Sequence, residues 1–110
     1  MNPAQWTALR YLAHANESAR QVGAFAVFHN TTPSSASQTI TALVKKGMVV
    51  KTRSTDGRSR TLCLTRKGHR TLSHDPILEL SAVIQTLPDA KMYLLAETMQ
   101  LLVQEVLSKR

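Results

Sequence analysis

Apolar residues recur at intervals of three and four along the first part of the chain, which is the period of an amphipathic helix. Asn2 followed by Pro3 forms a helix start and predicts a helix over residues 3–14. A shorter helix is expected over residues 21–28, followed by a tight turn in which Asn30 can adopt the left-handed conformation. The apolar positions that define these helices are Trp6, Leu9, Leu12, Ala13, Val22, Phe25 and Ala26.

The next segment divides clearly into an apolar and a polar face. Thr32-Pro33 repeats the cap-and-proline start, and Gly47 stands where a C-cap glycine belongs, so a helix is predicted over residues 33–46. Its apolar face consists of Ala36, Ile40, Leu43 and Val44, and its polar side presents Ser34, Ser35, Ser37, Gln38, Thr41 and Lys45. A short helix, a tight turn and a polar-faced helix in this order indicate a helix-turn-helix.

After Gly47 the period changes from 3.6 to 2. Residues 48–53 and 60–64 are predicted to be strands, and the turn-forming residues 54–59 between them predict a hairpin. Two strands alone are marginally stable, so this hairpin must lie against the helices.

The C-terminal third is helical again. Thr65 can cap a helix from Arg66, Pro76 forces a kink or a fresh start, and Pro88-Asp89 begins the last helix. The last helix carries a heptad seam of Met92, Leu95, Met99, Leu102 and Val106. Because this helix is apolar on several sides, we expect the seam to form a homodimer interface, the alternative being an intramolecular core.

The expected fold is therefore mainly α with a small β-hairpin (α+β). We expect residues 1–70 to hold the helix-turn-helix and the hairpin, and residues 71–110 to form C-terminal dimerisation helices, within one compact domain overall. A length of 110 residues agrees with one domain.

Charge distinguishes the hairpin segment from the rest of the chain. The sequence has 14 Lys and Arg against 7 Asp and Glu, a formal charge of +7. Residues 45–70 hold nine of the bases and Asp56 as the only acid, a net of +8, whereas residues 71–108 have a net of −4. Such a localised surplus indicates a polyanionic partner, and its position after a groove-sized helix indicates double-stranded DNA.

Each half of the predicted site has its own chemistry. Short hydroxyl side chains can reach bases or phosphates, and Gln38 can pair bidentately with adenine; the alternative is an ordinary solvated helix face. Arg58 at the hairpin tip can enter the narrow minor groove of A·T-rich DNA, and Asp56 could hold it through a charge-assisted bond. The alternative here is a charged hairpin that protects a sheet edge. The bases expected to reach DNA phosphates are Lys45, Lys46, Lys51, Arg53 and Arg60.

At this point the sequence resembles a known family. Residues 32–49 resemble the recognition helix and following turn of the multiple-antibiotic-resistance regulator (MarR) family, and residues 56–68 resemble its wing and entry to the next helix. Pro3-Ala4-Gln5-Trp6 with Leu9 is similar to the family's helix before the helix-turn-helix. The resemblance implies a winged-helix transcription regulator that is dimeric through its terminal helices and binds a pseudo-palindromic operator.

The sequence departs from the family pattern in three ways. Members usually have another helix before the region matched by residues 3–14; without it we expect the dimer to be built mainly from the two C-terminal helices. Family recognition helices often carry arginine where this chain has Gln38 and Ala42. A shortened dimer region also argues against a pocket for the family's aromatic-acid effectors, so a small-molecule effector is the least supported partner.

The remaining residues favour structural roles. Cys63 has no second cysteine, which favours a structural thiol over a redox switch and fits a reducing cytoplasm. His69 and His74 fall on different helix faces, so no metal site is expected, and no arrangement suggests a nucleophile, a cofactor or a phosphate loop. We therefore expect no enzyme, no cofactor and no membrane span. The other functions kept open are a protein-interaction module that docks onto a larger partner and a Cys63-based redox regulator.

Overall fold

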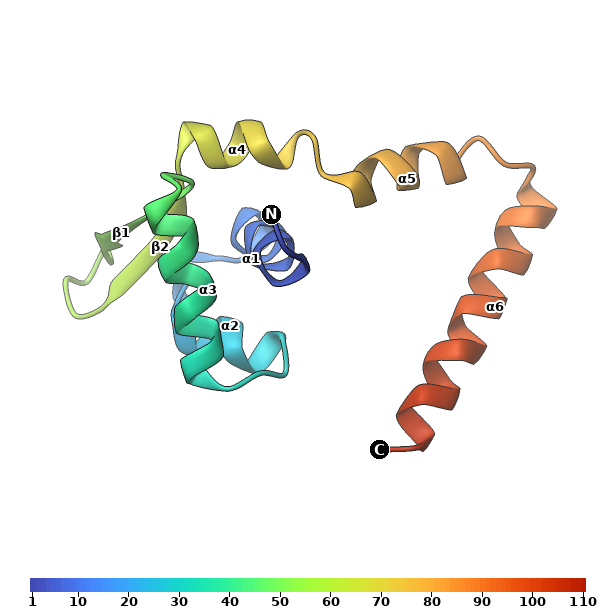
Figure 1. The fold of residues 1–110 in the computed structure, drawn as a ribbon, viewed down its shortest axis with the longest axis horizontal. Coiled ribbons are helices and arrows are strands. Elements are labelled where there is room, and N and C mark those ends of the chain that lie inside the picture. The colour runs from blue at the N-terminus through green and yellow to red at the C-terminus, as the bar shows by residue number, and fades with distance from the viewer. The chain divides into compact units, whose positions relative to one another are not determined.

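The computed structural model describes residues 1–110 as two compact units, residues 1–75 and residues 76–110. The order of elements is helix, helix, helix, hairpin and three further helices, which is the predicted mainly α arrangement with one small hairpin (Figure 1). The helices are α1 (Pro3–His14), α2 (Val22–Phe28), α3 (Pro33–Lys45), α4 (Arg66–Leu72), α5 (Pro76–Ile84) and α6 (Asp89–Ser108), and the strands are β1 (Val49–Arg53) and β2 (Arg60–Leu64).

Side-chain caps set where the helices of the first unit begin. The Asn2 side chain accepts a bond from the Gln5 amide at 2.8 Å, and the Gln5 side chain accepts the Asn2 amide in return. The Thr32 hydroxyl caps α3 through the Ser35 amide at 3.1 Å. In the turn before α3, Asn30 has a φ of 52°, as its position in the sequence predicts. The sequence missed one element, a short 3-10 helix at Glu17–Ala19.

The two strands pair antiparallel, from Val49 opposite Leu64 to Arg53 opposite Arg60. Met48, predicted to begin the first strand, lies just before β1, and its carbonyl accepts the Thr65 amide at 3.0 Å. The Leu62 amide donates to the Arg20 carbonyl at 2.7 Å, which ties the hairpin to the segment before α2.

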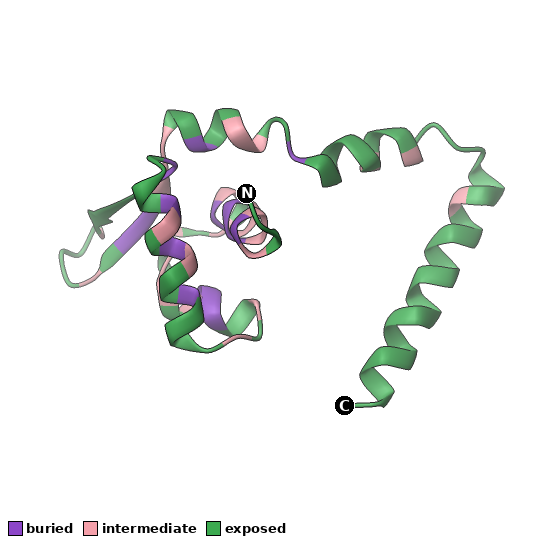
Figure 2. Cartoon of the chain, in the orientation of Figure 1, coloured by how far each residue is buried: buried purple, intermediate pink, exposed green.

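The core lies entirely in the first unit (Figure 2). Its largest fully buried apolar side chains are Phe25, Leu9, Ile40, Leu43 and Leu62. Val44, expected on the buried face of α3, is 38% exposed because it lies about 100° around the helix from Leu43. Ala36, Ile40 and Leu43 are the buried residues of α3, and its other residues are half-buried or exposed.

A buried ion pair marks the end of the first unit. Arg10 on α1 donates two hydrogen bonds to Asp75, one of them from Nη2 at 2.8 Å, and the Asp75 side chain has no exposed surface. The first unit therefore extends to Asp75. Pro76 then starts α5 afresh, as one of the two expected possibilities.

The second unit consists of α5 and α6 and buries no residue (Figure 2). Neither these helices nor any other in the structure is long and apolar enough to cross a membrane.

Candidate nucleic-acid interface

The polar face of α3 is open to solvent. All five predicted major-groove residues are exposed and lie opposite the buried stripe of Ala36, Ile40 and Leu43. They are Ser34, Ser35, Ser37, Gln38 and Thr41. Ser35 bonds the Thr32 hydroxyl at 3.0 Å, whereas the side chains of the other four have no hydrogen-bond partner within the chain. Their donors and acceptors are free to meet base edges if α3 lies in a DNA major groove.

Lysines close the C-terminal end of α3. Lys45 is exposed in the last turn and Lys46 is the C-cap residue, where cations favour the negative end of the helix dipole. The Lys46 ammonium donates to the Gln5 side chain at 2.8 Å and is thereby held at the start of α1. Of the two, only Lys45 makes no hydrogen bond or ion pair within the chain.

Arginines lie at the outer end of the hairpin, which we call the wing (residues 49–64). Arg53 and Arg60 are cross-strand partners, and like charges directly opposite each other destabilise a sheet. They line a shallow polar hollow of about 280 Å³ together with Gly57, Arg58 and Ser59. An anion in this hollow would relieve the repulsion, so the wing is suited to bind phosphate.

Asp56 acts on the wing backbone and does not pair with the Arg58 guanidinium as expected. Its Oδ1 accepts bonds from the Ser54 hydroxyl and from the Arg58 amide at 2.9 Å. These hydrogen bonds lower the pKa of Asp56. Gly57 between them has a φ of 72°, which favours glycine. The wing tip is thus shaped by a local carboxylate turn, and the Arg58 guanidinium is left unpaired.

A contact missed by sequence reasoning holds the wing from the side. Glu17 accepts the Thr55 amide at 2.6 Å and the Thr55 hydroxyl at 2.8 Å, and Gln21 donates to the Ser59 hydroxyl at 3.3 Å. We call Glu17, Gln21, Thr55 and Ser59 the wing clamp. The bonds from the Thr55 backbone and hydroxyl lower the pKa of Glu17. The one signal in the sequence was that Glu17 is the only acid among residues 1–44.

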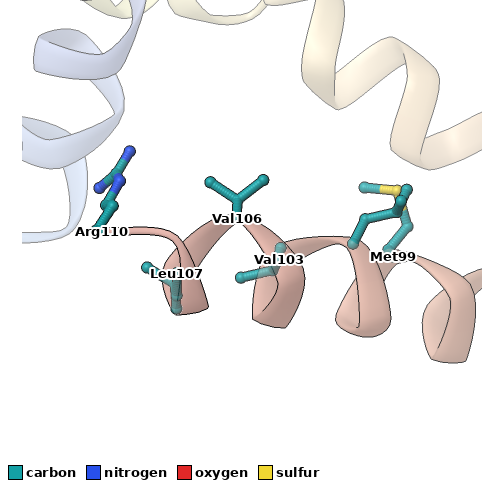
Figure 3. Close-up of a pocket in the computed structure, with 6 residues that line it drawn as sticks. Met99, Val103, Val106, Leu107 and Arg110 are labelled. Atoms are coloured by element: carbon teal, nitrogen blue, oxygen red, sulfur yellow. The ribbon is translucent and has the colours of Figure 1, made fainter.

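The predicted dimer seam is solvent-accessible on α6. Met99, Leu102 and Val106 are each more than half exposed, while Leu95 is 36% exposed and Met92 partly buried. Figure 3 shows Met99 and Val106 projecting from the same side of α6, where they line a hollow of about 320 Å³. A larger apolar groove of about 850 Å³ lies between α5 and α6 and includes Met92, Leu95 and Met99.

Cys63 lies on β2 and is partly exposed. Its sulfur is 3.8 Å from Arg20 Nη1 and 3.7 Å from the Thr52 hydroxyl. The structure brings no second cysteine to it, because the chain has only one.

Comparisons with known proteins agree with this geometry. The model of the MarR family matches residues 1–59. A comparison with the curated proteins finds no match.

Solved structures with the same fold include several MarR-family proteins. A MarR family protein from Bacillus stearothermophilus is 19% identical with a TM-score of 0.70, covering 96% of this chain and 75% of that one. Staphylococcus aureus MepR in complex with DNA is 16% identical with a TM-score of 0.72, covering 100% and 80%. MarR of Staphylococcus aureus, in complex with salicylate and kanamycin, is 21% identical with a TM-score of 0.69, covering 100% and 75%.

Proposed function

The chain belongs to the MarR family of winged-helix DNA-binding transcription regulators, and we propose that it reads a specific double-stranded DNA site as a homodimer. Each subunit lays α3 in a major groove and inserts Arg58 of the wing into the neighbouring minor groove. The observation that carries this proposal is the row of five exposed polar side chains on α3, four of them without a hydrogen-bond partner, followed by an unpaired cationic wing.

Phosphate contacts come from the bases around these two elements. Lys45, Lys51, Arg53 and Arg60 are exposed and make no ion pair within the chain, so each can neutralise a phosphate and release counterions. Lys46 can do so after exchanging its bond with Gln5 for one with DNA. These contacts supply affinity, while Gln38 and its hydroxyl neighbours supply sequence preference.

Dimerisation buries the exposed apolar faces of α5 and α6. Exposed apolar surface on this scale marks an interaction site, and a two-fold axis would place the recognition helices about one DNA turn, ~34 Å, apart. Docking of the same faces onto a different protein is the competing interpretation. Size-exclusion chromatography with light scattering separates the two: the proposal expects a DNA-free homodimer, and a monomer would contradict it.

Selection of DNA from a random library tests the function directly. We expect enrichment of a pseudo-palindromic site with A·T-rich flanks at the positions of the wing. Arg58→Ala should weaken binding to this site more than to a version with G·C-rich flanks, because a guanidinium favours the narrow A·T minor groove. Equal losses would contradict minor-groove insertion, and failure to enrich any site would contradict the proposed function.

A second candidate function is control by a small aromatic anion. A relative of the same fold is bound to salicylate, and the first unit of this chain has an apolar hollow of about 510 Å³. It is lined by Tyr11, Phe28, Arg10, His14, Thr7 and Ala15. Salicylate should raise the melting temperature of the chain and lower its affinity for the selected DNA; no change in either would dismiss this candidate.

A further inference from the structure

The wing clamp joins two segments that are far apart in the sequence. The Glu17 carboxylate uses both of its oxygens on Thr55: Oε1 accepts the amide and the hydroxyl, and Oε2 accepts the hydroxyl at 2.7 Å. Gln21 adds its bond to Ser59 on the other side of the wing tip. The clamp therefore fixes the two ends of the loop that carries Arg58.

The clamp is coupled to the turn around Arg58. Thr55 precedes Asp56, whose carboxylate accepts the Arg58 amide at 2.9 Å. A bond that fixes Thr55 thus restrains the backbone from which the Arg58 side chain leaves. A two-stranded hairpin has little stability of its own, so a restraint from outside the wing adds to the local turn around Asp56.

The charge of Glu17 makes this arrangement unexpected. An anion next to a surface that meets DNA repels phosphates, and its removal alone should strengthen binding by up to about fivefold. Glu17 favours DNA binding only if its contact with the wing contributes more than its charge costs.

We propose that Glu17 is a positioning residue for DNA binding, which holds the wing so that Arg58 is directed at the minor groove before DNA arrives. The proposal rests on the proposed function, since it needs the wing to contact DNA. Preorganisation of a binding loop removes the entropy cost of ordering it in the complex. Loss of the clamp should outweigh the electrostatic gain and weaken binding by about fivefold or more.

The test is whether Glu17→Ala weakens or strengthens DNA binding. The probe is the duplex that the wild-type chain selects from a random library, with A·T-rich flanks. Glu17→Ala should weaken binding to it, whereas Glu97→Ala, which removes the same charge from an exposed position on α6, should leave binding unchanged or slightly stronger. Glu17→Gln retains an acceptor for the Thr55 amide and should recover part of the loss.

A double-mutant cycle asks whether Glu17 acts through Arg58. In an Arg58→Ala background, Glu17→Ala should no longer weaken binding, because there is no guanidinium left to direct.

Thr55→Val removes the hydroxyl from the other side of the contact and should reproduce part of the Glu17→Ala loss, while Thr55→Ser should bind as the wild type does. In Glu17→Ala without DNA, hydrogen exchange at the Thr55 and Arg58 amides should be faster than in the wild type, and exchange in α3 should be unchanged.

Three results would overturn the proposal: tighter binding by Glu17→Ala, a loss that persists in the Arg58→Ala background, or unchanged exchange at Thr55 and Arg58. Equal thermal unfolding of Glu17→Ala and wild type separates these outcomes from misfolding, and Thr55→Val repeats the test if Glu17→Ala unfolds. Failure of the wild-type chain to select DNA contradicts the proposed function itself, whereas the exchange experiment still tests the clamp.

Discussion

Asp75 is the buried carboxylate of this chain, and its charge is compensated by Arg10. The fork of the guanidinium meets both carboxylate oxygens, and this pairing raises the pKa of Arg10. Arg10→Met should leave Asp75 buried without its counter-ion and lower the free energy of unfolding by about 2–4 kcal/mol. This range lies below that of a fully buried ion pair, because the Arg10 side chain is 28% exposed and solvent screens its charge. Urea denaturation measures this loss.

The matched variant removes both charges. Arg10→Met with Asp75→Leu should recover most of the stability, because replacing both members of a buried pair by apolar side chains avoids the uncompensated charge. If the double variant were as unstable as Arg10→Met alone, the ion pair would not be the source of the loss.

Acid should loosen the wing. Glu17 and Asp56 both have a pKa lowered below the ordinary values of 4.5 and 3.8 by hydrogen bonds to their charged forms. A lowered folded-state pKa contributes stability that is present above the ordinary value and is lost as the pH falls through the folded one. Amide shifts of Thr55 and Arg58 should therefore titrate below about pH 4.5, and Glu17→Gln should abolish the Glu17 component at Thr55. A midpoint above 4.5 would contradict the clamp.

At the scale of elements, two glycines in helices should respond oppositely to alanine. A Cβ at Gly68 of α4 would lie 2.2 Å from the Met48 carbonyl oxygen, a backbone atom that cannot move freely. Gly68→Ala should therefore destabilise the chain by about 2 kcal/mol or more. Gly23 on α2 has open space around it, and Gly23→Ala should stabilise by about 0.5–1 kcal/mol through helix propensity.

Thermal unfolding of the two alanine variants is the measurement. Destabilisation of both would mean that α2 needs glycine for a reason other than space. Stabilisation of both would mean that α4 does not approach Met48 as closely as the structure has it.

The elements that the sequence predicts well are those with local signals. The Asn2 and Thr32 caps, the left-handed Asn30 and the change of period after Gly47 each act within a few residues, and the structure confirms them. The apolar face predicted for α3 included Val44, which is exposed, because the four apolar positions mark a wider face than the core covers.

The contacts that the sequence did not reveal join distant segments. Arg10 and Asp75 are 65 positions apart, and Glu17 and Thr55 are 38 apart. Hydrogen-bond partners at such separations follow from tertiary packing and leave no period or spacing to read. Asp56 shows a different limit, because the expected partner (the Arg58 guanidinium) and the observed one (the Arg58 backbone amide) are equally near in the sequence. The exposed polar residues of α3 could be predicted, because their exposure follows from the helix period alone.

At the scale of the whole molecule, charge and apolar surface are assigned to different units. The surplus of bases lies in residues 45–70, within the first unit, and the exposed apolar side chains of α5 and α6 make up the second. Charge in the first unit favours DNA through counterion release, which depends on salt, whereas apolar burial in the second depends on salt only weakly. Salt should therefore weaken DNA binding without dissociating the proposed dimer.

The separation of charge and apolar surface between the two units predicts how steeply DNA affinity falls with salt. If a dimer makes about eight phosphate contacts, a plot of log K against log salt should have a slope near −7. Lys51→Gln removes one contact per subunit and should reduce the slope by about 2, because each lost contact contributes about 0.9. Gln85→Ala, a neutral change in the second unit, should leave the slope unchanged. Fluorescence anisotropy at several salt concentrations gives the slopes, and light scattering at the same concentrations gives the mass. A slope near −3.5 with a monomer mass would assign DNA binding to single subunits, and an affinity independent of salt would show that the basic segment does not meet phosphate.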